Sequence, residues 1–314
     1  MLTTVQAPTT SRAPLGDPRL TATVPREYVH RVSVAEVFLT GWEADGTDSF
    51  LVRGQWPRSH ALFAPVGGHQ DPLLLAESIR QAGTLLSHAE YGVPFGHQFL
   101  MWNMSFSATA PAFEAGSAPT DIELHTRCHD IVRRGRSIAG MRYEVSLRRA
   151  GLTVATGGAN FSCTSPAAHR RLRTGRPTTT GRALPAPIDP AEVGHTDPEH
   201  VVLAAAAAPG EARWELRVDT GHAVYFDHPV DHVPGMVLIE AARQAARAVT
   251  RQPRALLLDL DTEFKRYAEL DAPCWIDARV EGTGAGGEQR VLVSGTQQGE
   301  RVFTAELSVG CPAV

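Results

Sequence analysis

Hydrophobic and polar positions along the chain form two matching series. Each series has two short segments with strand-like alternation, then a helix that is apolar almost all round, then longer strand-like segments separated by turns. A helix that is apolar on every side is expected to be buried. The predicted helices span residues 73–91 and 235–250, and the predicted strands span residues 37–42, 50–56, 98–107, 122–131, 141–148 and 152–161 in the first series and 201–207, 213–218, 256–264, 274–281, 290–297 and 301–309 in the second.

The two helical segments are copies of one another. FAPVGGHQDPLLLAESIRQA begins at Phe63 and FDHPVDHVPGMVLIEAARQA begins 163 residues later at Phe226. The identities in this one register include five at Phe63, Glu77, Arg80, Gln81 and Ala82. Three of the five are polar, so the chain is predicted to be a tandem duplication. One helix against one curved sheet leaves a sheet face and edge unprotected, and two such units side by side are expected to complete a continuous sheet around two helices. The predicted fold class is therefore α+β: a tandem double hotdog, in which two antiparallel sheets each wrap a central apolar helix and form a pseudo-dimer within one chain.

The same pattern divides the chain into four parts. Residues 1–24 are rich in Thr, Ala and Pro and are predicted to be a flexible tail, with order beginning near Tyr28. Residues 25–164 form the first hotdog repeat. Residues 165–198 are rich in Pro, Thr and Arg without periodicity, which is typical of a linker, and residues 199–314 form the second repeat.

Composition narrows the class of protein and its location. With 43% hydrophobic and 20% charged residues the chain has the composition of a soluble globular protein. Its net charge of −4 gives no general attraction to nucleic acid or to an anionic membrane, and the N-terminal residues contain no run long enough to cross a bilayer. The four cysteines are scattered, which favours reduced thiols over disulfides. We therefore expect a cytoplasmic protein with no nucleic-acid or membrane partner, possibly monomeric.

Polar residues in the second helix predict a catalytic site. Glu240, Arg243 and Gln244 lie at i, i+3 and i+4 and share one stripe. A carboxylate in an apolar tunnel has a raised proton affinity, which suits a general base; the alternative is a structural ion pair. The backbone N–H groups of Gly235 and Met236 stand at the positive end of the helix dipole, where they could stabilise an oxyanion.

The first helix repeats this arrangement with one difference. Glu77, Arg80 and Gln81 have the same spacing, which predicts a second site or a paired role. Pro72 stands at the position of Gly235, so the first copy lacks that N–H donor. The second copy is therefore the stronger candidate for the chemistry.

Two histidines precede the second helix. The spacing of His228 and His232 superficially suits a metal, but they lie in a loop and no third ligand is evident. We therefore expect no metal site and no other cofactor. His228 could instead polarise or orient a substrate.

Several segments resemble known hotdog proteins. PGMVLIEAARQA and LDTEFKRYAEL resemble the central helix and the following strand of β-hydroxyacyl-carrier-protein dehydratases. More closely, VPREYVHRVSVAEVFLTGW, QWPRSHALFAPVGGHQDPLLLAESIRQAG, GHQFLMWNMSF and DHPVDHVPGMVLIEAARQA resemble the A-factor biosynthesis (γ-butyrolactone synthase) hotdog family from about Val24 to near the C-terminus. Glu240 aligns with the dehydratases' catalytic acid, but Phe226 stands where those enzymes have a loop histidine, which counts against dehydration.

The resemblance implies an acyltransferase. Such an enzyme would join a β-ketoacyl group from an acyl carrier protein thioester to a hydroxyl of dihydroxyacetone phosphate, on the way to a γ-butyrolactone or a related furan or butenolide signalling molecule. The alternatives are an acyl thioesterase or dehydratase of the hotdog class, and a non-catalytic acyl-binding regulator. A phosphorylated acceptor needs cations, which predicts substrate contacts from Arg80, Arg243, Lys265 and Arg266. Lys265 and Arg266 are equally well explained as a solvated strand edge. The remaining predicted substrate contacts are Gln81, Gln244 and His232.

Two further groups of residues, one basic and one apolar, are candidates for functional surfaces. Basic side chains could dock an acidic carrier protein, although a soluble surface has the same composition: Arg133, Arg134, Arg136, Arg170, Arg171, Arg173, Arg176 and Arg182. Apolar side chains between helix and sheet could line an acyl tunnel, although most must be ordinary core: Phe99, Met101, Trp102, Met104, Phe106, Phe264 and Trp275.

Overall fold

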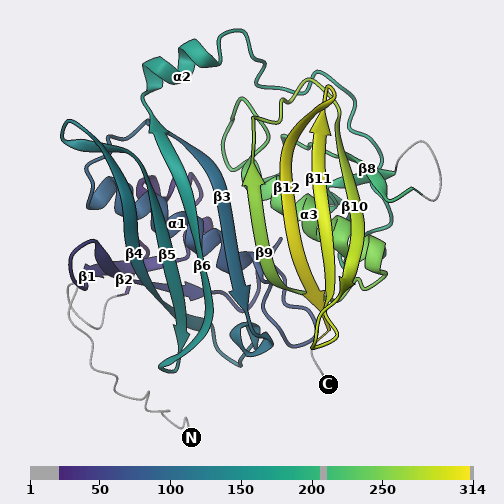
Figure 1. Cartoon of the computed structure of the whole chain (residues 1–314), viewed down its shortest axis with the longest axis horizontal. Coiled ribbons are helices and arrows are strands. Elements are labelled where there is room, and N and C mark those ends of the chain that lie inside the picture. Colours follow the sequence, from purple (N-terminus) through teal and green to yellow (C-terminus); the bar gives the residue numbers. More distant parts are fainter. Residues whose placement is uncertain (1–20, 206–210, 312–314) are drawn as a thin grey trace, which may run out of the picture.

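A computed structural model describes residues 21–205 and 211–311 of the chain. Within these residues each repeat has six strands and one long central helix (Figure 1). The first repeat consists of β1 (Leu39–Ala44), β2 (Ser49–Trp56), α1 (Leu73–Ala89), β3 (Gln98–Ala108), β4 (Thr120–Arg134), β5 (Ser137–Arg149) and β6 (Leu152–Thr164). The second consists of β7 (Leu203–Ala205), β8 (Arg213–Leu216), α3 (Gly235–Thr250), β9 (Leu256–Phe264), β10 (Cys274–Thr283), β11 (Gln289–Gln297) and β12 (Glu300–Gly310).

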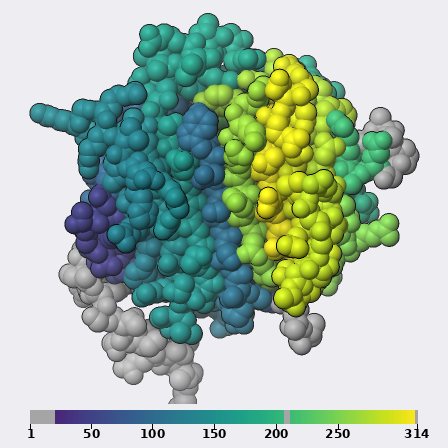
Figure 2. Space-filling model, in the orientation of Figure 1, coloured from purple at the N-terminus to yellow at the C-terminus, as the bar shows by residue number. Residues whose placement is uncertain are grey.

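All of these strands belong to one antiparallel sheet. Its order is β1-β2-β4-β5-β6-β3-β9-β12-β11-β10-β8-β7, and both long helices lie behind it in Figure 1. The repeats meet where β3 pairs with β9, from Asn103↔Glu263 to Ser107↔Asp259, and the two halves abut along this line in Figure 2. The predicted double hotdog is therefore present, and the sheets of its two repeats join into one continuous sheet, as expected.

Local sequence explains where α1 begins and how closely the sheet approaches it. The Asp71 carboxylate accepts a hydrogen bond from the N–H of Leu73 at 2.8 Å, as expected of a residue that caps a helix. Further along, the Tyr143 hydroxyl donates to the carbonyl of Ile79 at 2.8 Å. A Cβ on Gly83 would lie 2.5 Å from that hydroxyl oxygen, so β5 can pack this closely only against a glycine.

The expectation that order begins near Tyr28 is wrong. Most of the predicted tail, residues 1–20, lies outside the described residues, but Val24 is buried and its N–H donates to the carbonyl of Leu39 at 2.9 Å. The predicted turn at Pro209 and Gly210 also lies outside the described residues.

The segment predicted as a linker is not featureless. It contains α2 (Pro166–Leu172), a short helix above the sheet in Figure 1. Arg173 follows this helix and is buried between two carboxylates, Asp231 at 3.2 Å and Glu269 at 2.7 Å. Arg173 is thus unavailable for docking a partner, and it holds α2 against the loop that precedes α3.

Candidate active site

Glu77 of α1 is a fully buried carboxylate with three polar partners. Arg80 contacts it at 2.6 Å, Arg31 at 2.7 Å and the Gln81 amide at 2.7 Å. Burial alone would raise the pKa of Glu77, but the charges of Arg31 and Arg80 outweigh it and lower the pKa to about 2. Glu77 is therefore ionised and anchors two arginines.

Glu240 of α3 lies in an equivalent cluster. It is fully buried, and it contacts Arg243 at 2.7 Å, His195 at 2.9 Å and the Gln244 amide at 2.6 Å. Burial would raise the pKa of Glu240, but the Arg243 charge and the His195 hydrogen bond hold it well below its usual range. The predicted raised proton affinity is wrong because these partners stabilise the ionised form.

The two helix glutamines are also committed to internal contacts. The Gln81 side chain accepts the N–H of Phe38, and that of Gln244 accepts the N–H of Val202, at 3.0 Å in both cases. Each amide group also donates to a backbone carbonyl and to its helix glutamate. They were expected to bind substrate, and in this structure they tie each helix to the segment before the first strand of its repeat.

The expected phosphate contacts Lys265 and Arg266 both form surface ion pairs. Lys265 pairs with Glu263 and Arg266 with Glu300, both at 3.1 Å, and both basic side chains are largely exposed. Neither residue lines the internal cavity of the protein. They form the solvated edge that was the alternative interpretation.

An internal cavity of about 210 Å³ lies between α1 and the start of α3. Both repeats line it: α1, β3, β5 and β6 from the first, and the loop 224–234 with the first turns of α3 from the second. Five predicted site residues meet there, namely Arg80, His228, His232, Gly235 and Met236. Glu77, Glu240, Arg243, Gln81, Gln244, Lys265 and Arg266 do not line it. The start of α3 thus faces the arginine of the other repeat's helix.

One end of the cavity is polar and carries the two arginines held by Glu77. The Nε and Nη2 atoms of Arg80 are hydrogen-bonded, but its Nη1 has no acceptor among residues 21–205 and 211–311. Asp227 also lines this end, with its carboxylate 3% exposed and bound by the N–H groups of Val32 and Ser33. Arg80 therefore retains a donor for an anionic ligand.

The start of α3 supplies two further donors. The N–H groups of Gly235 and Met236 have no hydrogen-bond acceptor among the described residues, as expected in the first turn of a helix. A Cβ on Gly235 would lie 3.5 Å from the Phe264 ring, an ordinary contact. The small size of Gly235 is therefore not needed for packing, and the residue lines the cavity.

His232 is held in place by a chain of polar contacts. Its Nδ1 lies 2.7 Å from the Asp231 carboxylate, which Arg173 and His169 also contact at 3.2 and 3.1 Å. The hydrogen bond from His232 is the largest of the effects that lower the pKa of Asp231. A histidine oriented by a carboxylate at one ring nitrogen leaves its other nitrogen for proton transfer.

Comparison with known proteins identifies the family. The model of the A-factor biosynthesis hotdog domain matches residues 13–165 and again residues 178–312. The 2-oxo-3-(phosphooxy)propyl 3-oxoalkanoate synthase of Streptomyces virginiae is 54% identical over 286 residues, which covers 91% of this chain and 97% of that protein. The chain belongs to the A-factor biosynthesis hotdog family. The resemblance seen in the sequence is confirmed.

Other matches agree with this family assignment. The synthase of the same name from Streptomyces coelicolor is 41% identical and covers 91% of each chain. An acyl-ACP thioesterase structure from Bacteroides thetaiotaomicron is similar in fold, with a TM-score of 0.51, 10% identity, and coverage of 83% of this chain and 98% of that one. Together with the continuous sheet, this confirms the tandem hotdog fold of this A-factor family member.

Several residues of this cavity were not predicted from the sequence. His30, Arg31, Asp227 and the Asp231 that orients His232 were not singled out. One signal did exist for Arg31: it lies 46 residues before the glutamate that it contacts, and His195 lies 45 residues before its own. The similar separation in the two repeats identifies the position of Arg31 but does not show which residue Arg31 contacts.

Only part of the predicted acyl tunnel lines the cavity. Phe99, Met101 and Met104 do, together with Phe63, Phe161 and Ile239. Trp102 is 41% exposed, and neither it nor Phe106, Phe264 or Trp275 lines the cavity.

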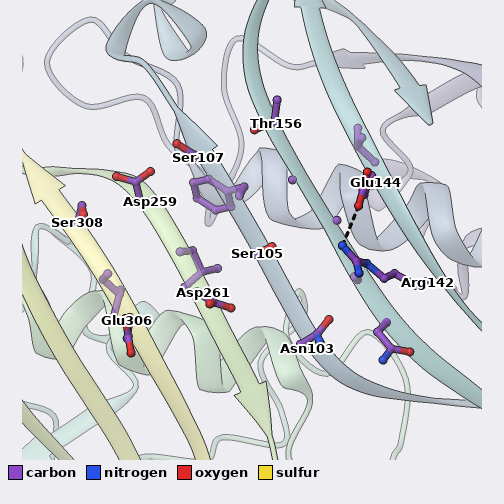
Figure 3. A pocket seen from close by; sticks show the side chains of 18 of the residues that line it. Asn103, Ser105, Ser107, Arg142, Glu144, Thr156, Asp259, Asp261, Glu306 and Ser308 are labelled. Carbon is purple, nitrogen blue, oxygen red and sulfur yellow. Dashed lines mark hydrogen bonds and ion pairs between the residues drawn. The ribbon is translucent and has the colours of Figure 1, made fainter. Parts of the chain in front are cut away.

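A larger hollow of about 960 Å³ lies on the opposite face of the sheet, where the repeats meet. Figure 3 shows its short polar side chains and the acidic Asp259, Asp261 and Glu306. One of its two arginines, Arg142, is paired with Glu144 at 2.7 Å. None of the predicted catalytic or substrate-contact residues lines this hollow, and of the expected tunnel residues only Phe106 does.

No helix of the described chain is long and apolar enough to span a membrane. Within the same residues, no three or more His, Cys, Asp or Glu side chains are grouped as metal ligands.

The buried position of Glu240 gives a prediction that separates structure from catalysis. Glu240→Gln should lower the free energy of unfolding by about 3 kcal/mol at pH 7, because it leaves buried cations undercompensated. The lowered pKa means that this stabilisation is present above the ordinary value of 4.5 and is lost as pH falls further. Urea unfolding at pH 7 and pH 3 should therefore show a difference from wild type that shrinks in acid.

The matched control is Glu263→Gln, which removes an exposed ion pair and should change stability by less than about 1 kcal/mol. Unchanged stability of Glu240→Gln with abolished activity would contradict this structural role and restore the catalytic interpretation.

Proposed function

We propose that this chain transfers a 3-oxoacyl group from a thioester to a hydroxyl of dihydroxyacetone phosphate. The name of its relatives describes the ester that this reaction would make. The acceptor oxygen would attack the thioester carbonyl, so that a C–O bond forms and the C–S bond breaks. The hydroxyl proton would pass to the departing thiolate. The reaction needs an anion site, a base and an oxyanion site.

The proposal rests on one observation: Arg80 of the first repeat and the start of α3 in the second repeat line the same cavity. Arg80 has an unused Nη1, and Arg31 lies beside it, which suits a phosphate monoester. The carboxylate of Asp227 accepts hydrogen bonds from the backbone N–H groups of Val32 and Ser33. The phosphate would therefore lie at this end of the cavity.

The reacting groups would lie at the start of α3. Gly235 and Met236 offer N–H donors to the oxyanion of the tetrahedral intermediate. His232, oriented by Asp231, would take the proton from the acceptor hydroxyl. The volume of about 210 Å³ is below the usual range for a whole drug-sized ligand, so the cavity would hold the acceptor and the first acyl carbons.

The donor would be an acyl carrier protein thioester. α2 carries the exposed Arg170 and Arg171 and is anchored through Arg173 to the loop that lines the cavity. An acidic carrier protein docked there would be close to that loop.

The test is to incubate the protein with 3-oxoacyl thioester and an acceptor, and to measure the ester by mass spectrometry. Dihydroxyacetone phosphate should react with kcat/KM at least about 10²-fold above that of dihydroxyacetone, because a charge-assisted pair is lost without phosphate. Arg80→Met should abolish most of that preference, mainly through the reaction with the phosphorylated acceptor.

Parallel reactions with carrier-bound and coenzyme A thioesters identify the donor. No ester from folded protein, or free acid or enoyl product without acceptor, would contradict the proposal. An equal rate with both acceptors would contradict the phosphate site alone.

A further inference from the structure

The two repeats place equivalent contacts around their helix arginines. Arg31 contacts Glu77 from the segment before β1, and His195 contacts Glu240 from the segment before β7. The loops before the helices match as well, since the Nδ1 atoms of His60 and His222 each accept two backbone N–H groups. The surroundings of Arg80 and Arg243 can therefore be compared position by position.

At Arg243 the anion position is filled by the protein itself. Both carboxylate oxygens of Asp71 lie 2.7 Å from its Nη1, and the two side chains are 6% and 1% exposed. The residue that corresponds to Asp71 in the second copy is Pro234, which has no charge and lines the open cavity. The Nη1 atom thus has no acceptor among the described residues in Arg80, whereas in Arg243 it is paired with a carboxylate.

The two repeats also differ at an aromatic residue in the loop before each helix. The N–H groups bound by His60 belong to Leu62 and Phe63, and those bound by His222 belong to Val224 and Tyr225. Tyr225, and not Phe226 as the sequence register indicates, is therefore the counterpart of Phe63. The Tyr225 hydroxyl is buried without a hydrogen-bond partner among the described residues. Burial raises its pKa, and the carboxylate of Glu240 adds to this effect, so Tyr225 is neutral beside the Arg243 cluster.

We propose that the surroundings of Arg243 are an occluded second copy of the substrate site, in which the Asp71 carboxylate occupies the place of a bound oxyanion. The ligand class of that place is a small oxyanion, such as a carboxylate or phosphate. The inference rests on the proposed function only for the identity of the anion at Arg80. Of these two equivalent places, the one at Arg80 is accordingly open, and it is built from the helix of the first repeat and the loop of the second.

An ordinary structural ion pair would not predict that an external anion replaces Asp71. The Nε of Arg243 is buried and lacks a hydrogen-bond partner within the described residues, as does the Tyr225 hydroxyl. Removal of the Asp71 carboxylate would leave a cationic space surrounded by donors, which is the environment that retains a small anion.

The experiment compares thermal unfolding in sodium formate, sodium phosphate and sodium chloride at equal ionic strength. Asp71→Ala should melt at least about 6 °C below wild type in chloride, because it leaves a buried cation undercompensated. Formate at about ten times its dissociation constant should raise the melting temperature by about 3 °C. Wild type should show no such response to formate, and Asp71→Ala/Arg243→Met should lose the response because its anion-binding cation is gone.

An Asp71→Ala protein that melts identically in formate, phosphate and chloride would overturn the proposal. If that variant is insoluble in chloride, refolding yield is compared in the three salts, and equal yields overturn it likewise. Asp71→Asn, in which an amide fills the space, should melt below wild type without responding to formate. Ester synthesis is not used as a readout, so a failed function assay with a positive formate response would reject the proposed function and leave the occluded site in place.

Discussion

Gly235→Pro is expected to reduce ester formation by about 10²- to 10³-fold while the protein stays folded. Proline removes the N–H that would stabilise the oxyanion, but its fixed φ suits the first position of a helix. Pro234 already has the extended conformation that a following proline requires, with φ −58° and ψ 142°. Steady-state kinetics together with a melting curve would separate the two effects.

Two variants serve as controls for this prediction. Gly235→Ala keeps the N–H and has room for its methyl group beside Phe264, so it should retain activity within about tenfold. Pro72→Gly adds the missing donor to the occluded copy and should not change the rate. Equal activity of Gly235→Pro and Gly235→Ala would exclude an oxyanion role for this N–H.

His232→Gln is expected to lower kcat by about 10²- to 10⁴-fold, because glutamine can occupy the site but cannot take a proton from the acceptor hydroxyl. The matched control is His69→Gln. His69 lies 163 residues earlier, in the loop before α1, where its Nδ1 contacts the carbonyl of Gly67 and its side chain does not line the cavity. That control should leave kcat unchanged.

Single-turnover measurement with saturating acceptor would identify the affected step. A raised KM with unchanged kcat in His232→Gln would mean that the residue only binds substrate. Asp231→Asn should reproduce part of the loss of kcat, since Asp231 orients the imidazole but does not touch the reacting atoms.

The fold was predictable because its signals are local or repeated. Alternation and turn residues located the strands, and the shared Glu, Arg and Gln located both helices in one register. The continuous sheet was expected as well, because two units side by side protect each other's edges. The β3–β9 pair that joins the repeats was not identified, because its partners are far apart in sequence and carry no spacing signal.

The site was predicted only in part because its members come from different repeats. Spacing along α3 placed Gly235 with Glu240, whereas in space Gly235 shares a cavity with Arg80. The state of Glu240 depends on His195, 45 residues away, and its partner Arg243 contacts Asp71, 172 residues away. A helix pattern shows that a carboxylate is buried, but the distant partners decide whether its pKa rises or falls.

Joining the repeats through β3 and β9 in a single polypeptide has an evolutionary consequence. In a symmetric homodimer every substitution appears at both equivalent sites, so a carboxylate that blocks one site blocks the other. Covalent fusion removes that coupling: a proline can stand at position 234 while an aspartate stands at position 71. Under this proposal one half-site serves as internal support, with a buried salt bridge in place of a ligand, while its neighbour keeps an open cavity.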